Sequence, residues 1–323
     1  LPLIMKAEED QEISLESSLM ELLPSFKDSN KDTVTVKEIL SHFGRLKSWI
    51  PFYKKTQDSS TGKNLKQFYR SKKTHLFNVK VAEHIYLNKH YKDSIYTYIK
   101  NADQREIAEY KYSDLGYYIL KEALERKYQK SLAQIVEEEF YQYLGANRTT
   151  YLPLLKFDKK EIIPTEKDTY YRNQLLHGHV HDMGAAMLGG VGGHAGLFAN
   201  ANDVAKIMQM YLQKGYYGGK RYLKTKTINK FNKRYFSDKN VRRGIGFDKP
   251  QLDPEVKATC GCVSEESFGH SGFTGTYTWA DPVSGIIYIF LSNRVYPTMD
   301  NSELIETNMR TEIQQVIQDA IIY

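Results

Sequence analysis

Three consecutive residues, Tyr112, Ser113 and Asp114, place a phenol, a hydroxyl and a carboxylate side by side just before a stretch with helical periodicity. Ser113 is of a type that caps helix N-termini, which puts Asp114 in the first turn. The unpaired amides and the dipole at that end of a helix favour negative charge, so a tyrosinate at Tyr112 should form more easily there than in water. The triplet is therefore either a tyrosine general base with its surroundings or an ordinary helix cap.

A second group of small polar residues, His270, Ser271 and Gly272, stands shortly before a predicted β-hairpin. The hairpin strands, residues 277–281 and 286–291, are rich in β-branched and aromatic side chains and are joined by Pro-Val-Ser-Gly. A hairpin does not require small polar residues in the segment that precedes its first strand. They form either a bend where two backbones pass closely or the polar edge of a site in which a substrate lies along a strand.

Three histidines alternate in the stretch HGHVHD: His177, His179 and His181. On a strand, alternate side chains point to the same side, so the three imidazoles could share a zinc ion. A polar loop or a supporting role explains the same spacing, and we expect no metal site here.

The glycine-rich stretch GGVGGHAG, residues 189–196, contains a loose match to the dinucleotide-binding fingerprint. That fingerprint requires a preceding strand and a following helix within a βαβ unit, and the surrounding sequence indicates no parallel strands. We interpret the glycines instead as a place where two backbones cross closely, because only glycine fits there.

One Ser-x-x-Lys occurs in the chain, at Ser60 and Lys63. On a helix this spacing would place a nucleophilic serine and a lysine on one face. The neighbouring residues are typical of a turn, so we interpret this match as a coincidence.

The composition is that of a folded globular protein, and it argues against nucleic-acid binding and against a membrane-spanning segment. Hydrophobic residues make up 41% and charged residues 26% of the 323 residues. The formal charge is +6, but basic and acidic residues are interleaved, and the densest basic cluster, residues 54–73, is typical of a solvated loop. We expect no nucleic-acid partner. No apolar run approaches the ~20 residues of a membrane span, and no signal pattern is visible, so we expect no transmembrane segment.

The two cysteines, Cys260 and Cys262, are separated by one residue. A disulfide between them would close a very small ring, and two thiolates are too few ligands for a structural zinc. Cysteine usage therefore leaves the redox compartment open.

Periodicity and capping residues predict an α+β layout. Helices are expected after the caps Thr35, Ser113, Ser131 and Asn200, with a final amphipathic helix from residue 304 to 317. Glycines at 44, 145 and 215 would end three of these helices. A strand near 244–247 and the hairpin come after most of the helices, which is typical of helices covering an antiparallel sheet.

The order of these motifs resembles the serine β-lactamase and penicillin-binding-protein family, in its class C and esterase-like branch. The resemblance rests on Tyr-Ser-Asp before a helix and on the stretches MLGGVGGHAGLFANANDVAKIMQMYL, FGHSGFTGTYTWADP and IFLSNRVYP. It extends from Leu1 to the end of the chain. It is strongest toward the module that some bacterial family 3 glycosidases carry behind their sugar-cleaving domain, so the resemblance leaves open a glycosidase domain ahead of this chain in the natural protein.

The resemblance implies a β-lactamase/transpeptidase-like α+β fold, in which an antiparallel sheet is flanked by helices and joined by a mainly helical subdomain. Residues 1–323 would form one such unit. Residues 35–235 would be its mainly helical part, and residues 1–34 and 236–323 its helix-plus-sheet part. No metal and no cofactor are implied.

Site roles follow from the resemblance residue by residue. Tyr112 would be the general base or proton shuttle. Asp114 stands where the family commonly has asparagine and would contact a substrate amide. Catalysis would also use His270 and the backbone N–H of Phe273, the latter as one oxyanion-hole donor.

Ser271 and Gly272 complete the substrate-binding strand in this resemblance. Ser271, with His270, would hold a substrate carboxylate and the proton network. Gly272 would let the substrate lie beside the strand.

The nucleophile of the family is the serine of a Ser-x-x-Lys at the start of a helix whose end resembles LPLIMK. It is therefore expected upstream of Leu1, and Ser60 cannot be its equivalent because it falls well after that helix. We interpret the chain as lacking its N-terminal part, including strands that would complete the sheet.

The function implied is a serine acyl hydrolase or transferase that forms an acyl-enzyme with a wall peptide, a β-lactam or a small ester. The location implied is the periplasm or cell envelope. The alternative is a catalytically inactive module that binds peptidoglycan peptides, and a third possibility is a zinc hydrolase that uses the three alternating histidines.

Overall fold

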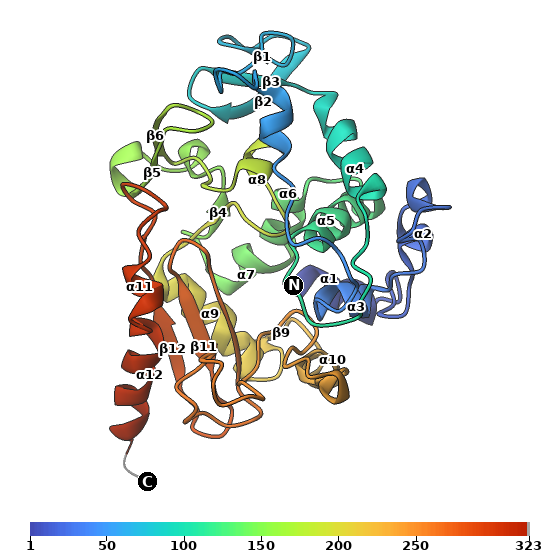
Figure 1. The fold of residues 1–323 in the computed structure, drawn as a ribbon. Coiled ribbons are helices and arrows are strands. Elements are labelled where there is room, and N and C mark those ends of the chain that lie inside the picture. Colours follow the sequence, from blue (N-terminus) through green and yellow to red (C-terminus); the bar gives the residue numbers. More distant parts are fainter. Residues whose placement is uncertain (322–323) are drawn as a thin grey trace.

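Three antiparallel strands near the C-terminus form a sheet in the order β10-β11-β12 in the computed structural model, which describes residues 1–321 (Figure 1). They are β10 (Phe268–Ser271), β11 (Tyr277–Ala280) and β12 (Ile287–Phe290). His270 lies opposite Thr278, and Ser271 lies opposite Tyr277. The predicted hairpin is confirmed, and each of its strands is slightly shorter than expected.

Different helices cover the two faces of this sheet (Figure 1). On one face, Tyr277, Trp279 and Tyr288 pack with Ile313 and Ile317 of helix α12 (Met309–Asp319). The other face carries Phe268 and Ala280, which belong to the main core, and helix α9 (Ala201–Leu212) lies against β11 and β12 there. The sheet is thus a layer between two helices, and both of its faces are apolar near the middle.

Most of the remaining helices pack around the main core, whereas the short helix Glu303–Glu306 has no buried residue and lies next to α12 (Figure 1). The remaining helices are α1 (Pro2–Glu9), α2 (Leu19–Leu22), α3 (Val36–Leu40), α4 (Tyr91–Asn101), α5 (Leu115–Tyr128), α6 (Leu132–Val136), α7 (Gln142–Leu144), α8 (Met183–Met187), α10 (Thr225–Asn232) and α11 (Glu303–Glu306). This arrangement of helices around an antiparallel sheet confirms the predicted α+β class.

Short strands connect the helices. A second three-stranded sheet has the order β1-β3-β2, and three two-stranded pairs accompany it. The strands are β1 (Tyr69–Arg70), β2 (Phe77–Ala82), β3 (Ile85–Asn88), β4 (Thr150–Tyr151), β5 (Pro164–Asp168), β6 (Gln174–His177), β7 (Leu197–Phe198), β8 (Tyr216–Tyr217) and β9 (Lys220–Arg221). None of them was predicted, because most are too short to show a period of two.

The predicted helix caps are largely confirmed. The Thr35 hydroxyl accepts from the Glu38 amide, the Ser131 hydroxyl from the Gln134 amide, and the Asn200 side chain from the Asp203 amide. Each bond satisfies an amide that has no partner within the helix.

Several predicted boundaries are wrong. Helix α3 ends at Leu40 rather than at Gly44, because the chain turns at His42, which has a φ of 57°. Helix α5 is capped at Asp114 instead of Ser113, although the Ser113 hydroxyl still accepts from the Leu115 amide. The final helix is two helices, broken at Asn308 with a φ of 52°.

The strand predicted at residues 244–247 is not formed. Instead, the next residue, Asp248, makes an isolated antiparallel bridge to Gly269 of β10, with N···O distances of 2.9 and 3.1 Å. The apolar residues in this segment, such as Ile245 and Phe247, are buried in the core without belonging to a strand.

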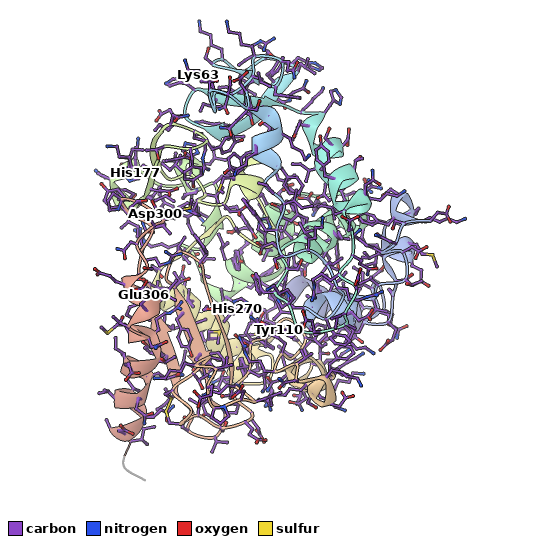
Figure 2. The ribbon with its side chains drawn as sticks, in the orientation of Figure 1. Lys63, Tyr110, His177, His270, Asp300 and Glu306 are labelled. Carbon is purple, nitrogen blue, oxygen red and sulfur yellow. A yellow bond between two sulfur atoms is a disulfide. The ribbon has the colours of Figure 1, made fainter. Side chains whose placement is uncertain are left out.

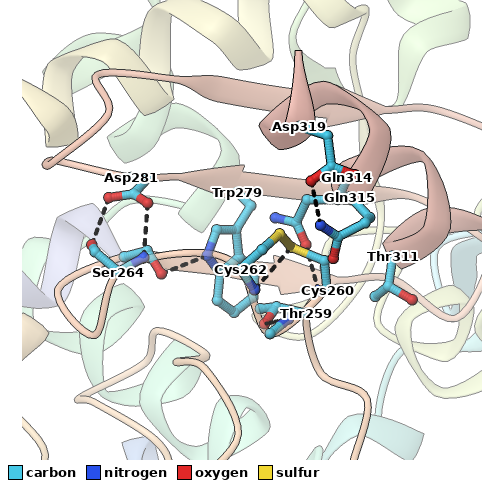
Figure 3. Close-up of a disulfide and its surroundings, with 12 residues drawn as sticks. Thr259, Cys260, Cys262, Ser264, Trp279, Asp281, Thr311, Gln314, Gln315 and Asp319 are labelled. Atoms are coloured by element: carbon cyan, nitrogen blue, oxygen red, sulfur yellow. Dashed lines mark hydrogen bonds between the residues drawn. A yellow bond between two sulfur atoms is a disulfide. The ribbon is translucent and has the colours of Figure 1, made fainter. Parts of the chain in front are cut away.

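Cys260 and Cys262 form a disulfide (Figure 3). The sequence had left the state of the two cysteines open; in the structure Gly261, with a φ of 81°, lets them turn toward each other. The Cys260 amide donates to the Gln314 side chain, so the disulfide loop is attached to helix α12.

Among residues 1–321, we find no helix with both the length and the apolar character needed to cross a membrane.

A buried ion pair attaches strands β5 and β6 to the loop before α8. The Arg172 Nε lies 2.7 Å from the Asp168 carboxylate, and both side chains are fully buried. The other guanidinium nitrogens donate to the carbonyls of Val180 and His181, and Asp168 also accepts from three backbone amides. Every charge in this group is therefore compensated.

We expect Arg172→Met to lower the free energy of unfolding by about 3–5 kcal/mol, because it leaves the Asp168 carboxylate and two carbonyls buried without their partner. Urea denaturation followed by circular dichroism would measure the change. Arg148→Met is the matched control, since its pair with Glu161 is roughly half exposed and should contribute less than about 1 kcal/mol. Equal effects of the two substitutions would contradict the importance of the buried group.

Candidate functional site

Tyr112, His270 and His42 meet beside the edge strand β10. The ring centroids of Tyr112 and His270 are 6.2 Å apart, and those of Tyr112 and His42 are 4.4 Å apart. The turn at His42 places its Nδ1 where it accepts from the Ser113 amide, at 3.2 Å. Tyr112 and His270, which are 158 positions apart in the sequence, are thus brought together as predicted, and His42 is a further member that was not predicted.

Two consecutive arginines lie behind this group. Arg242 donates twice to Asp248, at 2.8 and 3.0 Å, and the Arg243 Nε lies 3.2 Å from the same carboxylate. Arg243 also donates to the Tyr110 hydroxyl, and its guanidinium lies 5.6 Å from the ring of Tyr112. Figure 2 labels Tyr110 and His270 in this region. These residues were not predicted either, since an Arg-Arg pair resembles any exposed basic dipeptide.

The buried positive charge keeps both histidines neutral. Burial and then Arg243 lower the pKa of His270 to about 4, and the same two causes hold the pKa of His42 well below its usual range. His42 accepts through Nδ1, so its Nε2 carries the proton. This Nε2 and the Nη1 of Arg243 are buried donors that have no acceptor within residues 1–321. The site therefore presents unused N–H groups next to Tyr112.

The tyrosinate predicted at Tyr112 is not favoured. Although 37% of the residue is exposed, desolvation of its hydroxyl raises the pKa, and the charge of Asp114 raises it further, while Arg243 opposes both. The helix dipole was expected to lower this pKa. It is outweighed first by the desolvation of the hydroxyl and then by the carboxylate of Asp114, the cap residue, next to the phenol.

Asp114 itself has an unusual environment. Burial and the neighbouring Asp182 raise its pKa to about 6, although His194 and a hydrogen bond to Tyr112 act in the opposite direction. A carboxyl group in this state changes its charge near neutral pH, which an asparagine in the same place would not do.

Ser271, Gly272 and Phe273 end the edge strand and begin a tight turn. The Gly272 amide donates to the Thr276 carbonyl at 2.7 Å, so it is occupied. The Phe273 amide has no acceptor among the described residues. The Phe273 carbonyl accepts from Arg294 at 2.8 Å, and the aromatic ring is 62% exposed. The turn thus leaves the amide of Phe273 available to a ligand.

Alternation along β10 separates two residues that were expected to act together. His270 faces Tyr112, whereas Ser271 lies on the opposite face of the sheet and lines a cavity beside α12. The structure therefore does not bring these two side chains to one point.

The glycine-rich stretch packs against helix α5 through a close backbone contact. A Cβ on Gly193 would lie 2.4 Å from the Tyr117 carbonyl oxygen, which confirms the predicted crossing of two backbones. His194, the next residue, stacks on Tyr118 with ring centroids 4.2 Å apart, and its Nε2 lies 2.8 Å from the Asp182 carboxylate.

The Ser-x-x-Lys motif lies away from Tyr112 and His270, whereas His181 of the histidine motif packs against the ring of Phe273, with ring centroids 5.3 Å apart. Ser60 donates to Asp58 within a turn, and Figure 2 shows Lys63 at the top of the molecule, well away from His270 near its centre. His177 ends β6, and His181 lies 3.3 Å from Glu166. No cluster of three or more histidine, cysteine or acidic residues suited to a metal occurs in the described part of the chain.

The His194–Asp182 pair should titrate as a unit. Burial favours the neutral forms, but the ion pair prevails: the pKa of Asp182 falls to about 2, and that of His194 rises above its usual 6.5. Since the Asp182 pKa is lowered and the His194 pKa is raised, the pair stabilises the fold fully above pH 3.8 and below pH 6.5. Its contribution declines as the pH falls toward 2 or rises through the raised pKa of His194.

We expect Asp182→Asn to move the titration midpoint of His194 from above 6.5 to below it, because burial remains and the compensating charge is lost. The pH dependence of the imidazole NMR signals measures this midpoint. Asp158→Asn, on the surface, is the control and should leave the midpoint in place. An unchanged midpoint in Asp182→Asn would contradict the pairing.

Comparison with known proteins identifies the family. A family model described as Beta-lactamase matches residues 3–309. A Salmonella typhi protein named "Putative D-alanyl-D-alanine carboxypeptidase" is 34% identical over 206 residues, which are 60% of this chain and 47% of that protein. The chain spans about half the length of the curated relatives that it matches.

Solved structures share the fold at lower identity. A penicillin-binding protein homologue from Caulobacter crescentus aligns with a TM-score of 0.57 and 15% identity, over 90% of this chain and 74% of that one. EstCE1, described as a hydrolase with promiscuous acyltransferase activity, aligns with a TM-score of 0.59 and 16% identity, over 96% and 81%. Because the family model covers nearly the whole chain and the fold agrees with it, this chain belongs to the beta-lactamase family.

Proposed function

We propose that this chain carries most of the active site of a serine acyl hydrolase that cleaves an amide or ester through an acyl-enzyme. The observation that carries the proposal is the meeting of Tyr112 with His270 beside the free amide of Phe273 at the end of an edge strand. Acyl transfer needs groups that move protons, and a phenol and a neutral imidazole can do so. It also needs a hydrogen-bond donor that stabilises negative charge on the carbonyl oxygen, and an unpaired backbone N–H supplies one.

Tyr112 acts in this proposal as a proton relay. Its raised pKa keeps the phenol protonated, so it can give its proton to the leaving group while it accepts the proton that the serine loses on attack. When water attacks the acyl-enzyme, the phenol accepts a proton from the water and returns one to the serine oxygen as the serine leaves. Arg243, 5.6 Å from the ring, favours the negative charge that develops on the phenol oxygen during each transfer.

The Phe273 amide is the proposed donor to the carbonyl oxygen. An oxyanion-hole donor must be free in the resting protein and rigidly held, and the turn that begins at Gly272 holds this amide in place. Asp114, protonated below about pH 6, would offer a hydrogen bond to a substrate amide much as asparagine does in the family.

The nucleophile is proposed to lie outside the 323 residues, in the natural polypeptide before Leu1. Ser60 and Lys63 form the chain's one Ser-x-x-Lys, and they lie far from His270 (Figure 2). The greater length of the Salmonella relatives supports a longer natural protein. A glycosidase domain within that longer protein remains an expectation from the resemblance.

The substrate class proposed first is a peptide that ends in D-alanine, with β-lactams and small esters as related substrates. The name of the Salmonella relatives supports the peptide, and the likeness to EstCE1, a hydrolase with acyltransferase activity, supports small esters. Such a peptide substrate would place the protein in the cell envelope or periplasm. An inactive peptide-binding module is the second candidate, favoured by the absence of a serine–lysine pair beside Tyr112 within residues 1–321.

We expect intact-mass spectrometry to detect one covalent adduct after treatment with a fluorophosphonate or with penicillin, but only on a polypeptide extended upstream to its natural start. The 323-residue chain should gain no adduct, because its one Ser-x-x-Lys, at Ser60 and Lys63, lies far from His270 (Figure 2). Tyr112→Phe in the extended protein should slow release of the penicilloyl group by about 10²- to 10⁴-fold, the usual contribution of a positioned acid–base group.

Replacement of the upstream serine by alanine is the control that identifies the nucleophile. If the extended protein gains no adduct with either reagent, the hydrolase proposal fails. Titration with D-alanyl peptides would then test the peptide-binding alternative, which predicts saturable binding without turnover.

We expect Phe273→Pro to lower kcat/KM of the extended enzyme by about 10²- to 10³-fold, because proline removes the N–H that would bind the carbonyl oxygen. Phe273→Ala is the matched control, since it removes the same ring and keeps the amide. Steady-state hydrolysis of a chromogenic ester or β-lactam measures both variants. Equal losses would assign the effect to the ring and exclude the amide as a donor.

A further inference from the structure

The disulfide between Cys260 and Cys262 is a reactive group to which the proposed hydrolase assigns no part (Figure 3). One residue, Gly261, separates the two cysteines, and the sequence contains no other cysteine. Thiols and disulfides exchange by attack of a thiolate on a disulfide sulfur. Because no third thiol is present, this pair can open and close without pairing wrongly within the chain.

The disulfide adds little to the stability of the fold. A cross-link stabilises a protein mainly by restricting the unfolded chain, and this effect is smallest for the shortest loops. Hydrogen bonds also fix the loop on both sides of the disulfide. On one side the Cys260 amide donates to the Gln314 side chain at 3.1 Å, and on the other the Ser264 amide and hydroxyl donate to the Asp281 carboxylate at 2.8 and 2.5 Å. The S–S bond can therefore open while the surrounding loop stays in place.

The two cysteines differ in their access to solvent. Cys262 and Gly261 are exposed, whereas Cys260 is only partly exposed and follows Thr259, which is buried. A Cβ placed on Gly261 would meet one nearby group, the side-chain amide nitrogen of Gln251 at 3.3 Å, so the outer side of the loop is open. The rate of exchange depends on which sulfur an incoming thiolate can reach. Cys262 is therefore the cysteine that is open to attack.

A backbone amide is directed at the other sulfur. The Cys262 N–H donates to the Cys260 Sγ, with an N···S distance of 3.4 Å. A hydrogen-bond donor at a sulfur stabilises its thiolate form, and a sulfur that leaves readily as a thiolate makes exchange faster. Access and hydrogen bonding thus assign matching parts: Cys262 is attacked, and Cys260 leaves.

The conformation of Gly261 links the chain to the state of the two sulfurs. Its φ of 81° lies in the left-handed region, which residues with a side chain adopt only at a cost. This conformation brings the two cysteines together in the closed disulfide. The open dithiol does not require it. The equilibrium between the closed and open states therefore depends on the residue at position 261.

We propose that Cys260, Gly261 and Cys262 form a thiol–disulfide exchange site that accepts electrons from a dithiol. One thiolate of the dithiol attacks the Cys262 sulfur. A mixed disulfide forms, and the bond between the two cysteines breaks with its electron pair going to Cys260.

The second thiolate of the dithiol completes the exchange. It attacks the dithiol's own sulfur in the mixed disulfide, and Cys262 leaves as a thiolate. Two electrons and two protons thus pass to the two cysteines, and the dithiol becomes a disulfide. This site does not depend on the proposed hydrolase activity, because it involves neither Tyr112 nor the upstream serine.

Treatment of the 323-residue chain with dithiothreitol, followed by iodoacetamide and intact-mass spectrometry, tests the proposal without any variant. We expect both cysteines to be alkylated in the native protein, with an unchanged circular dichroism spectrum. With glutathione, a monothiol, rapid alkylation and peptide mapping should place the glutathione on Cys262 and the alkyl group on Cys260. A disulfide that opens only in denaturing urea, or glutathione found on Cys260, would overturn the proposal.

Substitution of the intervening glycine tests what sets the equilibrium. Gly261→Ala should shift the equilibrium with dithiothreitol about tenfold toward the open dithiol, because a Cβ disfavours the left-handed conformation. Gly285→Ala is the matched control, since Gly285 has a φ of 73° in the turn of the hairpin and no atom within 4 Å of an added Cβ. This control should leave the equilibrium unchanged. Equal shifts in the two variants, or no shift in Gly261→Ala, would contradict the part assigned to Gly261.

Discussion

The structure around β10 depends on the placement of one buried carboxylate, Asp248, between two consecutive arginines. Burying Arg242 and Arg243 without a counter-charge would be costly, and Asp248 compensates both at distances of 2.8 to 3.2 Å. The backbone of the same residue pairs with Gly269 in both directions. One residue therefore balances the charge and joins the preceding segment to the edge strand.

This arrangement determines the chemistry on both sides of the strand. On the Tyr112 side, burial and the charge of Arg243 keep His42 and His270 neutral, and the Nδ1 of each is bonded within the protein, to the Ser113 amide and to the Ser271 carbonyl respectively. On the α12 side, Arg242 faces a cavity that also contains Arg310. The alternation of side chains along a strand divides the positive charge between two faces.

A second buried group holds the opposite wall of the site. His194 and Asp182 form an ion pair beneath Tyr118, and the adjacent Gly193 packs against the Tyr117 carbonyl so closely that no side chain fits. Asp114 lies within the electrostatic reach of this pair, and its raised pKa follows from the same burial. The pKa of Tyr112 is therefore set first by desolvation and then by the charges of Asp114 and Arg243, which together outweigh the helix dipole.

The sequence by itself determined the local features that depend on near neighbours. The caps at Thr35, Ser131 and Asn200, the hairpin after His270 and the close crossing at Gly193 are all consequences of residue type and spacing, and each was predicted. The resemblance carried by whole motifs also indicated the family and the meeting of Tyr112 with His270.

Only the tertiary structure decided the charge states of the titratable groups. It also decided which residues from distant parts of the chain become neighbours. The direction of the Tyr112 pKa shift was predicted wrongly, because desolvation and Asp114 outweigh the dipole, and neither effect is visible in spacing. The parts played by His42 and Arg243 likewise require knowing which segments pack together. Electrostatic energies depend on burial and on separation in space, and the order of residues along the chain fixes neither of these.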